Sequence, residues 1–543
     1  MLQTFEANSE GGFHMKLSKL LALVLVLCMV GASALAEVSM AGDGQPVKEG
    51  AAPGGNFVIQ SSGDPTYYAP DYRSDDNLWP IAQNVFNRLI KLAAGDGLDY
   101  DLASSYEFSE DGKDLTFHLR EGVKWHDGVP FTSKDVKWTY DTIIAKSWSR
   151  VTSLESIDSI ECPDDLTVVM HLKAADVTII PKLGWYDTFI LPEHIFGAVE
   201  DPEALFTQES SMIGTGPFKY DSHQTGVSFT LARNDDFWGD KPILDKLVFV
   251  NIGDEDTAYQ AWLNGEADYL YSLPEINTFD HDNDPDYRVF VSLYQNRTYL
   301  TFNFDDPIVS KVEVRQAFAK AIDRQGIFDR FGGGGALAEY FISPLQPLYL
   351  DKQYKMPDRD IEGAKKLLEQ AGFTPDADGY YLHLSMVGFE SGNWTEMAQA
   401  IKQYVKEAGI DLDVQMIDYG AWSDQVKVNK NFQVTMLAGY QGPDVSGVAG
   451  RVQSNGGTNL GGYNNPEVDA ALAASNIEAD TAKRAEYLSI VQKCMCEDMP
   501  MVFLMENGAH YPIKMSIVGT PYDVPEKAAS AEMTYTGFSA EKP

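Results

Sequence analysis

A strand–helix–strand pattern between residues 382 and 416 constrains the fold of this chain more than any other feature. Residues 382–386 alternate apolar and polar side chains, and residues 410–416 do so again. Between them, apolar residues recur at helical spacing over 397–408, and Gly409 suits the position just after a helix. Two strands joined through one helix by short loops lie parallel, with a right-handed crossover. This part of the chain is therefore expected to be an α/β domain with a mainly parallel sheet.

The length of the chain requires more than one such domain. With 543 residues it exceeds what a single hydrophobic core supports, which predicts two or three domains. Further alternating segments at 115–119, 166–172 and 227–231 predict half-buried strands in the first half. Strands and helices are mixed from residue 56 onward, so the expected fold class is α/β.

The charge balance excludes several kinds of partner. The chain has 80 acidic and 42 basic residues, which gives a formal net charge of −38. Nucleic acids and anionic membrane surfaces attract basic proteins, so neither is an expected partner. The charge favours solubility and says nothing about the fold.

The N-terminal segment has the three-part plan of a secretory signal. A short basic start at 15–19 precedes an unbroken apolar run at 20–30, and Ala34-Leu35-Ala36 supplies small residues before a cleavage site. The run is shorter than the roughly 20 residues that span a bilayer. We therefore expect residues 1–36 to be a signal peptide, with Met15 as the true start.

Residues 37–53 are small and polar and contain Gly and Pro, so they are expected to form a flexible leader on the exported protein. Cys28 offers an alternative, because bacterial lipoproteins are cleaved before a cysteine that then carries a lipid. The residue before it is Leu27, whereas that cleavage prefers a small residue. The expected location is the periplasm or the outer face of the cell envelope, with a lipid anchor through Cys28 as the alternative.

Three cysteines follow the signal, at positions 162, 494 and 496. An odd number cannot be fully paired within one chain. Cys494 and Cys496 lie two residues apart in a predicted helix, where their side chains point away from each other. All three are therefore expected to be buried free thiols.

Sequence signatures of catalysis and of metal binding are missing. The chain has no His-Glu-x-x-His, P-loop, Gly-x-Ser-x-Gly or Cys-x-x-Cys motif. His118 and His126 come nearest to a metal-ligand pair, and His118 falls on the outer face of its predicted strand, as a solvated side chain would. Acid pairs such as Asp235-Asp236 arise by chance among 80 acids. No cofactor, metal site or enzymatic activity is predicted, and a secreted hydrolase and a surface adhesin are the rival classes.

Aromatic residues in polar loops are the remaining signal. Tyr67, Tyr68, Trp394, Trp422 and Tyr440 lie in polar or Gly-rich loops rather than at periodic core positions. One such residue more often plugs a local core. As a set, they favour a cleft lined for a ligand.

Several collinear motifs add a resemblance. The most recognisable runs from Leu115 to Thr132 and contains Trp125-His126-Asp127-Gly128. The others are, in order, Gly214-Thr215-Gly216-Pro217-Phe218-Lys219, Asn234-Asp235-Asp236-Phe237-Trp238-Gly239, Val314-Arg315-Gln316-Ala317-Phe318 and Ala364-Lys365-Lys366-Leu367-Leu368-Glu369-Gln370-Ala371-Gly372. Together they cover about residues 54–510. In these motifs the chain resembles the extracellular solute-binding proteins of ABC importers, specifically the peptide/nickel-binding family, family 5.

This resemblance implies a two-lobe clamshell of the type II periplasmic-binding-protein kind, with an extra subdomain in the first lobe. Lobe 1 would comprise 54–300, with the inserted subdomain at about 84–212. Lobe 2 would comprise 301–500, and 501–543 would return to lobe 1. The ligand would lie between the lobes of a monomer, and closure would present it to the subunits of a membrane ABC permease. Peptide is the leading ligand class, with an oligosaccharide or a metal chelate as alternatives.

The resemblance also points to a departure in specificity. Peptide binders of the family carry an aspartate in a second-lobe Ala-Asp-Tyr-like stretch, where it pairs with the amino terminus of the peptide. Gly439 occupies that place here, and Asp444, five residues later, either substitutes for it or caps a turn. The predicted ligand contacts are Asp64, Tyr67, Tyr68, Glu390, Trp394, Trp422, Tyr440, Gln441 and Asp444.

Overall fold

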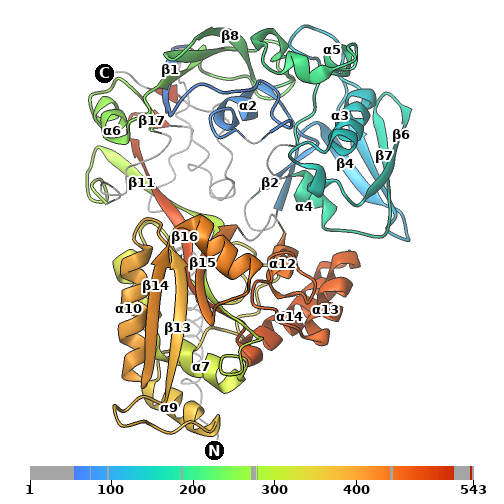
Figure 1. The fold of residues 1–543 in the computed structure, drawn as a ribbon. Coiled ribbons are helices and arrows are strands. Elements are labelled where there is room, and N and C mark those ends of the chain that lie inside the picture. The colour runs from blue at the N-terminus through green and yellow to red at the C-terminus, as the bar shows by residue number, and fades with distance from the viewer. Residues whose placement is uncertain are drawn as a thin grey trace, which may run out of the picture.

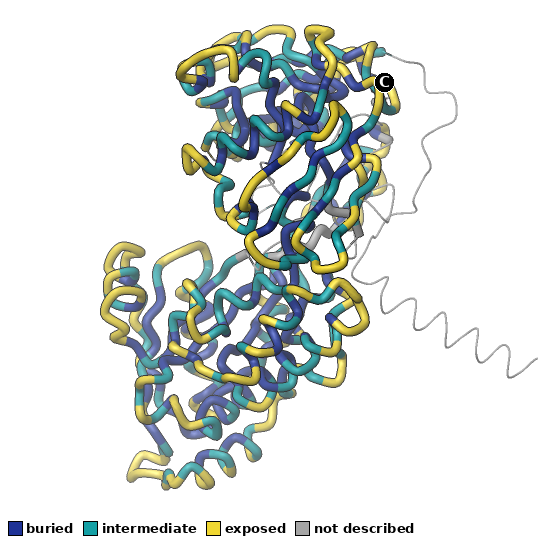
Figure 2. Tube along the Cα trace, turned by 90° about the vertical axis from the view of Figure 1, so that its right-hand side faces the viewer, coloured by how far each residue is buried: buried dark blue, intermediate teal, exposed yellow. Residues whose placement is uncertain are grey.

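The computed structural model describes residues 54–73, 75–93, 97–184, 188–270, 277, 279–440, 444–518 and 539–540. Over these residues the chain forms two lobes joined by long strands (Figure 1). Each lobe has its own hydrophobic core, one with most of its residues between Phe57 and Phe249 and the other between Tyr299 and Met505. Figure 2 shows the buried positions gathered inside each lobe. The two-lobe α/β fold expected from the sequence is confirmed.

The main sheet of the first lobe has four strands in the order β1-β10-β9-β8. β1 pairs with β10 in parallel, and the other two pairs are antiparallel. Its alternating burial follows from the alternating sequence, because one face of each strand packs on the core. The strands and flanking helices are β1 (Asn56–Ser61), β8 (Phe218–Gln224), β9 (Ser228–Arg233), β10 (Lys246–Asn251), α2 (Trp79–Val85) and α6 (Glu255–Leu263).

A second sheet, in the order β4-β5-β7-β6, forms a separate layer of the first lobe. Helix α3 covers it and begins with a capping box between Thr132 and Asp135, in which the side chain of each accepts the backbone amide of the other. The elements of this region are β2 (Ile90–Ala93), β3 (Gly97–Tyr100), β4 (Ala103–Phe108), β5 (Asp114–Leu119), α3 (Ser133–Lys146), β6 (Ile157–Asp164), β7 (Thr167–Leu172), α4 (Ile179–Leu183) and α5 (Glu193–Phe196).

The second lobe contains a six-stranded sheet in the order β12-β16-β11-β15-β13-β14. β13 is parallel to both β14 and β15, and helix α10 makes the crossover from β13 to β14. The βαβ unit predicted from residues 382–416 is therefore present. The elements are α7 (Val312–Ala321), α8 (Arg324–Phe331), β12 (Ala336–Leu337), α9 (Ile361–Gln370), β13 (Leu382–Phe389), α10 (Trp394–Glu407), β14 (Ile410–Ile417), α11 (Tyr419–Trp422), β15 (Val434–Tyr440), α12 (Ala449–Val452), α13 (Pro466–Ile477) and α14 (Thr481–Asp498).

Two antiparallel strands, β11 (Tyr287–Phe302) and β16 (Met501–Lys514), run through both lobes. β11 contributes Phe290 to the core of the first lobe and Leu300 to the core of the second. The register of this pair is interrupted between Leu293 and Arg297. The domain limits at 300 and 500 stay predictions, because these continuous strands belong to both lobes.

The motif around His126 has a structural role in the first lobe. Its imidazole lies 3.0 Å from the carbonyl oxygen of Gly216 and accepts the amide of Gly214 at 3.2 Å, so it joins two motifs far apart in the sequence. Burial lowers the pKa of His126 to about 4, which keeps the ring neutral. A side chain at Gly214 would meet the carbonyl of Val85, so glycine permits this close approach.

The remaining sequence predictions divide into those inside and outside the described residues. Cys162, Cys494 and Cys496 are free thiols as predicted, but only Cys494 is buried. Residues 1–53, which hold the predicted signal peptide and leader, lie outside the described residues. Within the described part, no helix is both long and apolar enough to cross a membrane.

Candidate ligand-binding site

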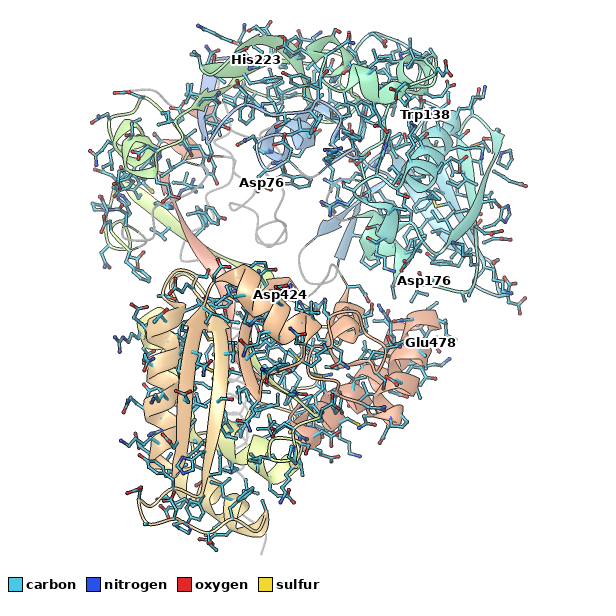
Figure 3. The ribbon with its side chains drawn as sticks, viewed as in Figure 1. Asp76, Trp138, Asp176, His223, Asp424 and Glu478 are labelled. Atoms are coloured by element: carbon cyan, nitrogen blue, oxygen red, sulfur yellow. The ribbon has the colours of Figure 1, made fainter. Side chains whose placement is uncertain are left out.

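The parallel strands of the second lobe end at one edge of its sheet. β13 ends at Phe389, β14 at Ile417 and β15 at Tyr440, and the carboxyl ends of parallel strands lie side by side. In open α/β sheets this is the edge where ligands bind. Asp424, which follows α11 after β14, lies on the side of this lobe that faces Asp76 of the first lobe (Figure 3).

This carboxyl edge carries a cluster of four aromatic rings. The ring of Phe389 lies 4.7 Å from that of Trp394, 5.1 Å from Tyr419 and 4.9 Å from Trp422. Tyr419 stacks on Trp422 and is 52% exposed. The Lys427 ammonium donates a hydrogen bond to the Tyr419 hydroxyl at 3.0 Å and lies 5.1 Å from the centres of the Tyr419 and Trp422 rings. The edge thus combines an apolar surface with a positive charge.

Trp422 itself is a positioning residue within this cluster. Its indole is only 1% exposed and donates to the Thr435 hydroxyl at 3.0 Å, and that hydroxyl donates onward to the Val387 carbonyl. The prediction that Trp394, Trp422 and Tyr440 lie in loops is wrong, because Trp394 begins α10, Trp422 ends α11 and Tyr440 ends β15. Trp394 is half-buried against Phe389, whereas Glu390 is exposed. That Glu390, Trp394 and Trp422 contact ligand stays a prediction.

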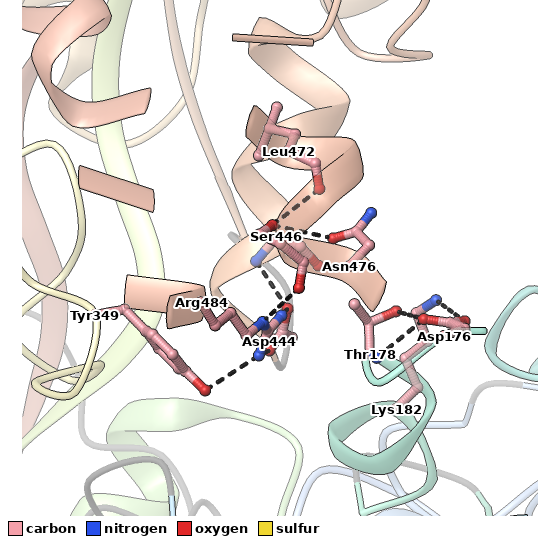
Figure 4. A network of polar contacts seen from close by, with 10 residues as sticks. Asp176, Thr178, Lys182, Tyr349, Asp444, Ser446, Leu472, Asn476 and Arg484 are labelled. Atoms are coloured by element: carbon pink, nitrogen blue, oxygen red, sulfur yellow. Dashed lines mark hydrogen bonds and ion pairs between the residues drawn. The ribbon is translucent and has the colours of Figure 1, made fainter. Parts of the chain in front are cut away.

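Asp444 lies at the start of the segment after β15, where it is fixed by a buried ion pair. Its carboxylate accepts two hydrogen bonds from Arg484, at 2.6 and 2.9 Å, and one from the amide of Ser446 at 2.9 Å (Figure 4). Although burial disfavours the charged guanidinium, the paired carboxylate raises the pKa of Arg484. These hydrogen bonds give Asp444 a structural role. That it also contacts ligand stays a prediction.

Of the neighbouring predicted contacts, Gln441 lies outside the described residues. Tyr440 ends β15 and its backbone pairs with Asn296 of β11. One residue earlier, Gly439 pairs with Arg297 of β11, and the guanidinium of Arg451 lies against it. Both strands belong to the second-lobe sheet at the point where β11 leaves for the first lobe.

Asp64 belongs to a polar network in the loop that follows β1. Its carboxylate accepts the amide of Gly226 at 2.7 Å and a hydrogen bond from the side chain of Asn251, and it lies 3.1 Å from the imidazole of His223. The other ring nitrogen of His223 lies 2.6 Å from Glu209. Burial opposes the charged imidazolium, but the two carboxylates raise the pKa of His223.

The two predicted tyrosines of the first lobe differ in exposure. Tyr68 is buried beside the His223 network, where burial and the charge of Glu209 raise its pKa to about 12. Tyr67 is half-buried and packs edge-on against Tyr72 at 5.1 Å. A hollow of about 410 Å³ borders this ring cluster and is lined by Tyr72, Arg73, Lys146, Ser147, Trp148, Ser149 and Glu203. Contact of Asp64, Tyr67 and Tyr68 with ligand remains a prediction.

Four side chains at this edge were not predicted from the sequence: Phe389, Tyr419, Lys427 and Arg451. The first two flank strand ends and could have been found once the edge of the sheet was predicted. The two cations have no local signal, because the fold alone brings them to this edge. Among the residues that the structure describes, no group of three or more His, Cys, Asp or Glu side chains is placed to hold a metal ion.

Comparison with known proteins agrees with this architecture. Residues 97–459 match the family described as bacterial extracellular solute-binding proteins, family 5. The oligopeptide-binding protein AppA of Bacillus subtilis is 27% identical over 489 residues, 86% of this chain and 89% of that protein. A putative ABC transporter peptide-binding protein of Brucella ovis is 30% identical over 417 residues, 74% of this chain and 77% of that protein.

A solved structure shows the same fold. The ABC transporter substrate-binding protein CtaP of Listeria monocytogenes superposes with a TM-score of 0.78 at 26% sequence identity. The superposition covers 90% of this chain and 99% of that chain, so both lobes are included.

Proposed function

The chain belongs to the bacterial extracellular solute-binding proteins of family 5, and from this premise we propose that it captures a short peptide between its lobes and delivers it to an ABC permease. The observation that carries the proposal is the carboxyl edge of the second-lobe sheet. There, exposed Tyr419 and charged Lys427 come shortly before and after Asp424 in the sequence, and Asp424 lies on the side that faces the first lobe (Figure 3). Apolar surface with a few placed polar groups suits a ligand of mixed character.

Peptide is the ligand class with the most support. The relatives in Bacillus subtilis and Brucella ovis are named as oligopeptide-binding and peptide-binding proteins. The exposed ring of Tyr419 would suit an oligosaccharide as well, so the names of these relatives are what favours peptide. The rival hydrolase and adhesin have no motif in the chain to support them.

Closure of the lobes would occur at the interrupted register of β11 and β16. Between the pairs Leu293–Gly508 and Arg297–Glu506, three residues of β11 face one residue of β16. Fewer ladder hydrogen bonds form at such an irregularity, so bending there costs less than bending within a regular ladder. In a monomer that closes in this way, the two lobes together form the surface that contacts the permease only when ligand is bound.

Delivery from outside the membrane requires export, which the family implies. We propose that a signal peptide ending at Ala36 directs it and that the exported chain begins at Glu37. N-terminal sequencing of the exported protein would show Glu37, whereas a lipid-modified Cys28 would contradict this cleavage site.

The binding proposal is tested by calorimetry and thermal shift of the exported chain with a mixed library of tri- to hexapeptides, and with matched libraries of oligosaccharides and metal chelates. Saturating peptide is expected to raise Tm, since a ligand at 100 times its Kd stabilises by about 2.7 kcal/mol. Stabilisation by sugars or chelates alone would contradict the peptide assignment.

A further inference from the structure

The two lobes also meet away from β11 and β16. The amide of Val177, just before α4 of the first lobe, donates a hydrogen bond of 2.9 Å to the carbonyl oxygen of Asn476 in α13 of the second lobe. In Figure 1, α4 and α13 lie on the right, whereas β11 and β16 lie towards the left. Asp176 and Glu478, the neighbours of these two residues, lie on the two sides of this junction (Figure 3). We call this contact the α4–α13 junction.

The first lobe presents the Val177 amide from a fixed turn. The Asp176 carboxylate accepts hydrogen bonds from both the amide and the hydroxyl of Thr178, and the ammonium of Lys182 lies 3.7 Å from that carboxylate (Figure 4). Thr178 is itself buried. Because the chain is held on both sides of Val177, its amide keeps its direction without help from the second lobe.

The second lobe offers the carbonyl from the last turn of α13. Carbonyl groups in the last turn of a helix have no partner within the helix, so that of Asn476 requires a donor from outside. The preceding carbonyl, that of Ser475, accepts from Nε of Arg484 at 2.9 Å. Arg484 also holds Asp444 after β15, so one arginine secures both the end of α13 and the segment that follows β15.

A pair of tyrosines near this junction also joins the two lobes. Burial raises the pKa of Tyr106 in β4 of the first lobe, and the charges of Tyr100 and of Tyr349 in the second lobe raise it further. The hydroxyl of Tyr349 accepts from Arg484 at 3.2 Å. Tyr106 is therefore close enough to the second lobe to interact with the same arginine-centred group of residues.

The position of the junction decides what happens to it when the lobes move. A rotation about the irregularity of β11 and β16 displaces a point in proportion to its distance from that hinge. A hydrogen bond weakens steeply once its atoms separate, so the junction is made at one lobe angle and lost at others. When it is lost, water satisfies both groups, and the net cost is that of one exchanged hydrogen bond, which keeps the contact reversible.

We propose that the α4–α13 junction is a latch that is made when the lobes close on ligand and broken when they open. This inference rests on the proposed function and deepens it by naming a contact that holds the closed form. Peptide and latch both favour the closed form, so the latch raises the affinity for peptide and slows its release.

A reversible disulfide across the junction tests the latch. V177C and N476C are introduced into the exported chain, with Cys162, Cys494 and Cys496 replaced by serine. Residues whose backbones share a hydrogen bond have Cα atoms about 5.5 Å apart, a span that a disulfide bridges. Oxidation before peptide is added is expected to lower the affinity for the library of tri- to hexapeptides by about 10-fold or more, as measured by calorimetry. Oxidation after loading is expected to slow peptide release by a similar factor, and reduction restores both in the same molecule.

Two single variants measure the hydrogen bond itself. V177P removes the donor, because proline has no N–H, and is expected to weaken peptide binding by about 3- to 10-fold. V177A keeps the amide and is the matched control, expected to bind within about 2-fold of the wild type. Far-ultraviolet circular dichroism and Tm check that both variants are folded.

Three results would overturn the latch and leave the proposed function standing. An oxidised chain that binds and releases peptide as the reduced chain does would show that the junction persists while the lobes move. A disulfide that forms neither with nor without peptide would show that the junction is not made. Unchanged affinity in folded V177P would show that the hydrogen bond does not hold the closed form. Absence of peptide binding by the reduced chain and the wild type would instead refute the proposed function, on which the latch rests.

Discussion

Two arginines from later helices lie near the end of β15, and they differ in burial and in partners. Arg484 of α14 is buried and donates two hydrogen bonds to Asp444, so its charge is neutralised inside the fold. Arg451 of α12 is partly exposed and rests on a residue without a side chain. The same residue type therefore forms a buried ion pair in one place and lies partly exposed against the end of β15 in the other. Burial and partners, rather than residue type, separate the two roles.

The largest expected effect comes from breaking the buried pair. Arg484→Met leaves the Asp444 carboxylate buried without its cation, which is expected to lower the free energy of unfolding by about 3–5 kcal/mol. Urea unfolding followed by circular dichroism measures the loss. R451Q is the control, expected to change stability by less than about 1 kcal/mol because its side chain is partly exposed. Equal losses in the two variants would erase the contrast between the arginines.

A smaller effect is expected at Trp422, the buried member of the aromatic cluster. Trp422→Phe removes the hydrogen bond to Thr435 and part of the ring volume, which is expected to destabilise the chain by about 1–3 kcal/mol. Peptide affinity per folded molecule is expected to stay within a few-fold, as measured by calorimetry. A large loss of affinity in a stable variant would show that Trp422 contacts ligand after all.

Tyr419 is the exposed ring of the same aromatic cluster, in contrast to the buried Trp422. It is 52% exposed, so Tyr419→Ala is expected to change the free energy of unfolding by no more than about 0.5 kcal/mol. Its expected effect is on binding, because the ring and the hydroxyl that accepts from Lys427 lie at the proposed site. If Tyr419→Ala binds the peptide library with unchanged affinity, the ring of Tyr419 does not contact the peptide.

The smallest expected effect is a pH dependence from the first lobe. His223, between Asp64 and Glu209 and close to Tyr68, has a raised pKa, so its stabilisation is complete below the unfolded pKa of about 6.5 and is lost as pH rises through the folded value. Tm is therefore expected to fall as pH rises above about 6.5, and to fall more in the wild type than in His223→Gln. If Tm depends on pH in the same way in both chains, His223 does not contribute this pH-dependent stability. Asp64 and Glu209, whose pKa values are lowered, act only at more acidic pH.

The parts of this picture that the sequence predicts are those set by local periodicity and topology. The alternation at 382–386 and 410–416 and the helix between them are enough to predict the β13–α10–β14 unit. Parallel strands then place Glu390 and Trp394, which follow β13, at one edge of the sheet. The family motifs predict both lobes, because those at 115–132, 214–219 and 234–239 lie in the first lobe and those at 314–318 and 364–372 lie in the second.

Partners that meet only through the tertiary fold could not be predicted. Arg484 lies forty residues beyond Asp444, and no local pattern indicates that they pair. The burial of Trp422 depends on Thr435 and Phe389, which come from other strands. For the same reason Gly439 could be recognised as a departure, while the guanidinium that lies against it could not.

Closure of the two lobes on a peptide is the central claim, and a distance between the two lobes tests it most directly. Asp76 and Asp424 are exposed and face each other from the two lobes (Figure 3). Spin labels at Asp76→Cys and Asp424→Cys, with Cys162, Cys494 and Cys496 replaced by serine, allow the distance to be measured by pulsed electron resonance. Saturating peptide is expected to shift the distance distribution to shorter values, and a chelate that does not bind is expected to leave it unchanged. A distribution that stays the same with bound peptide would contradict capture by closure.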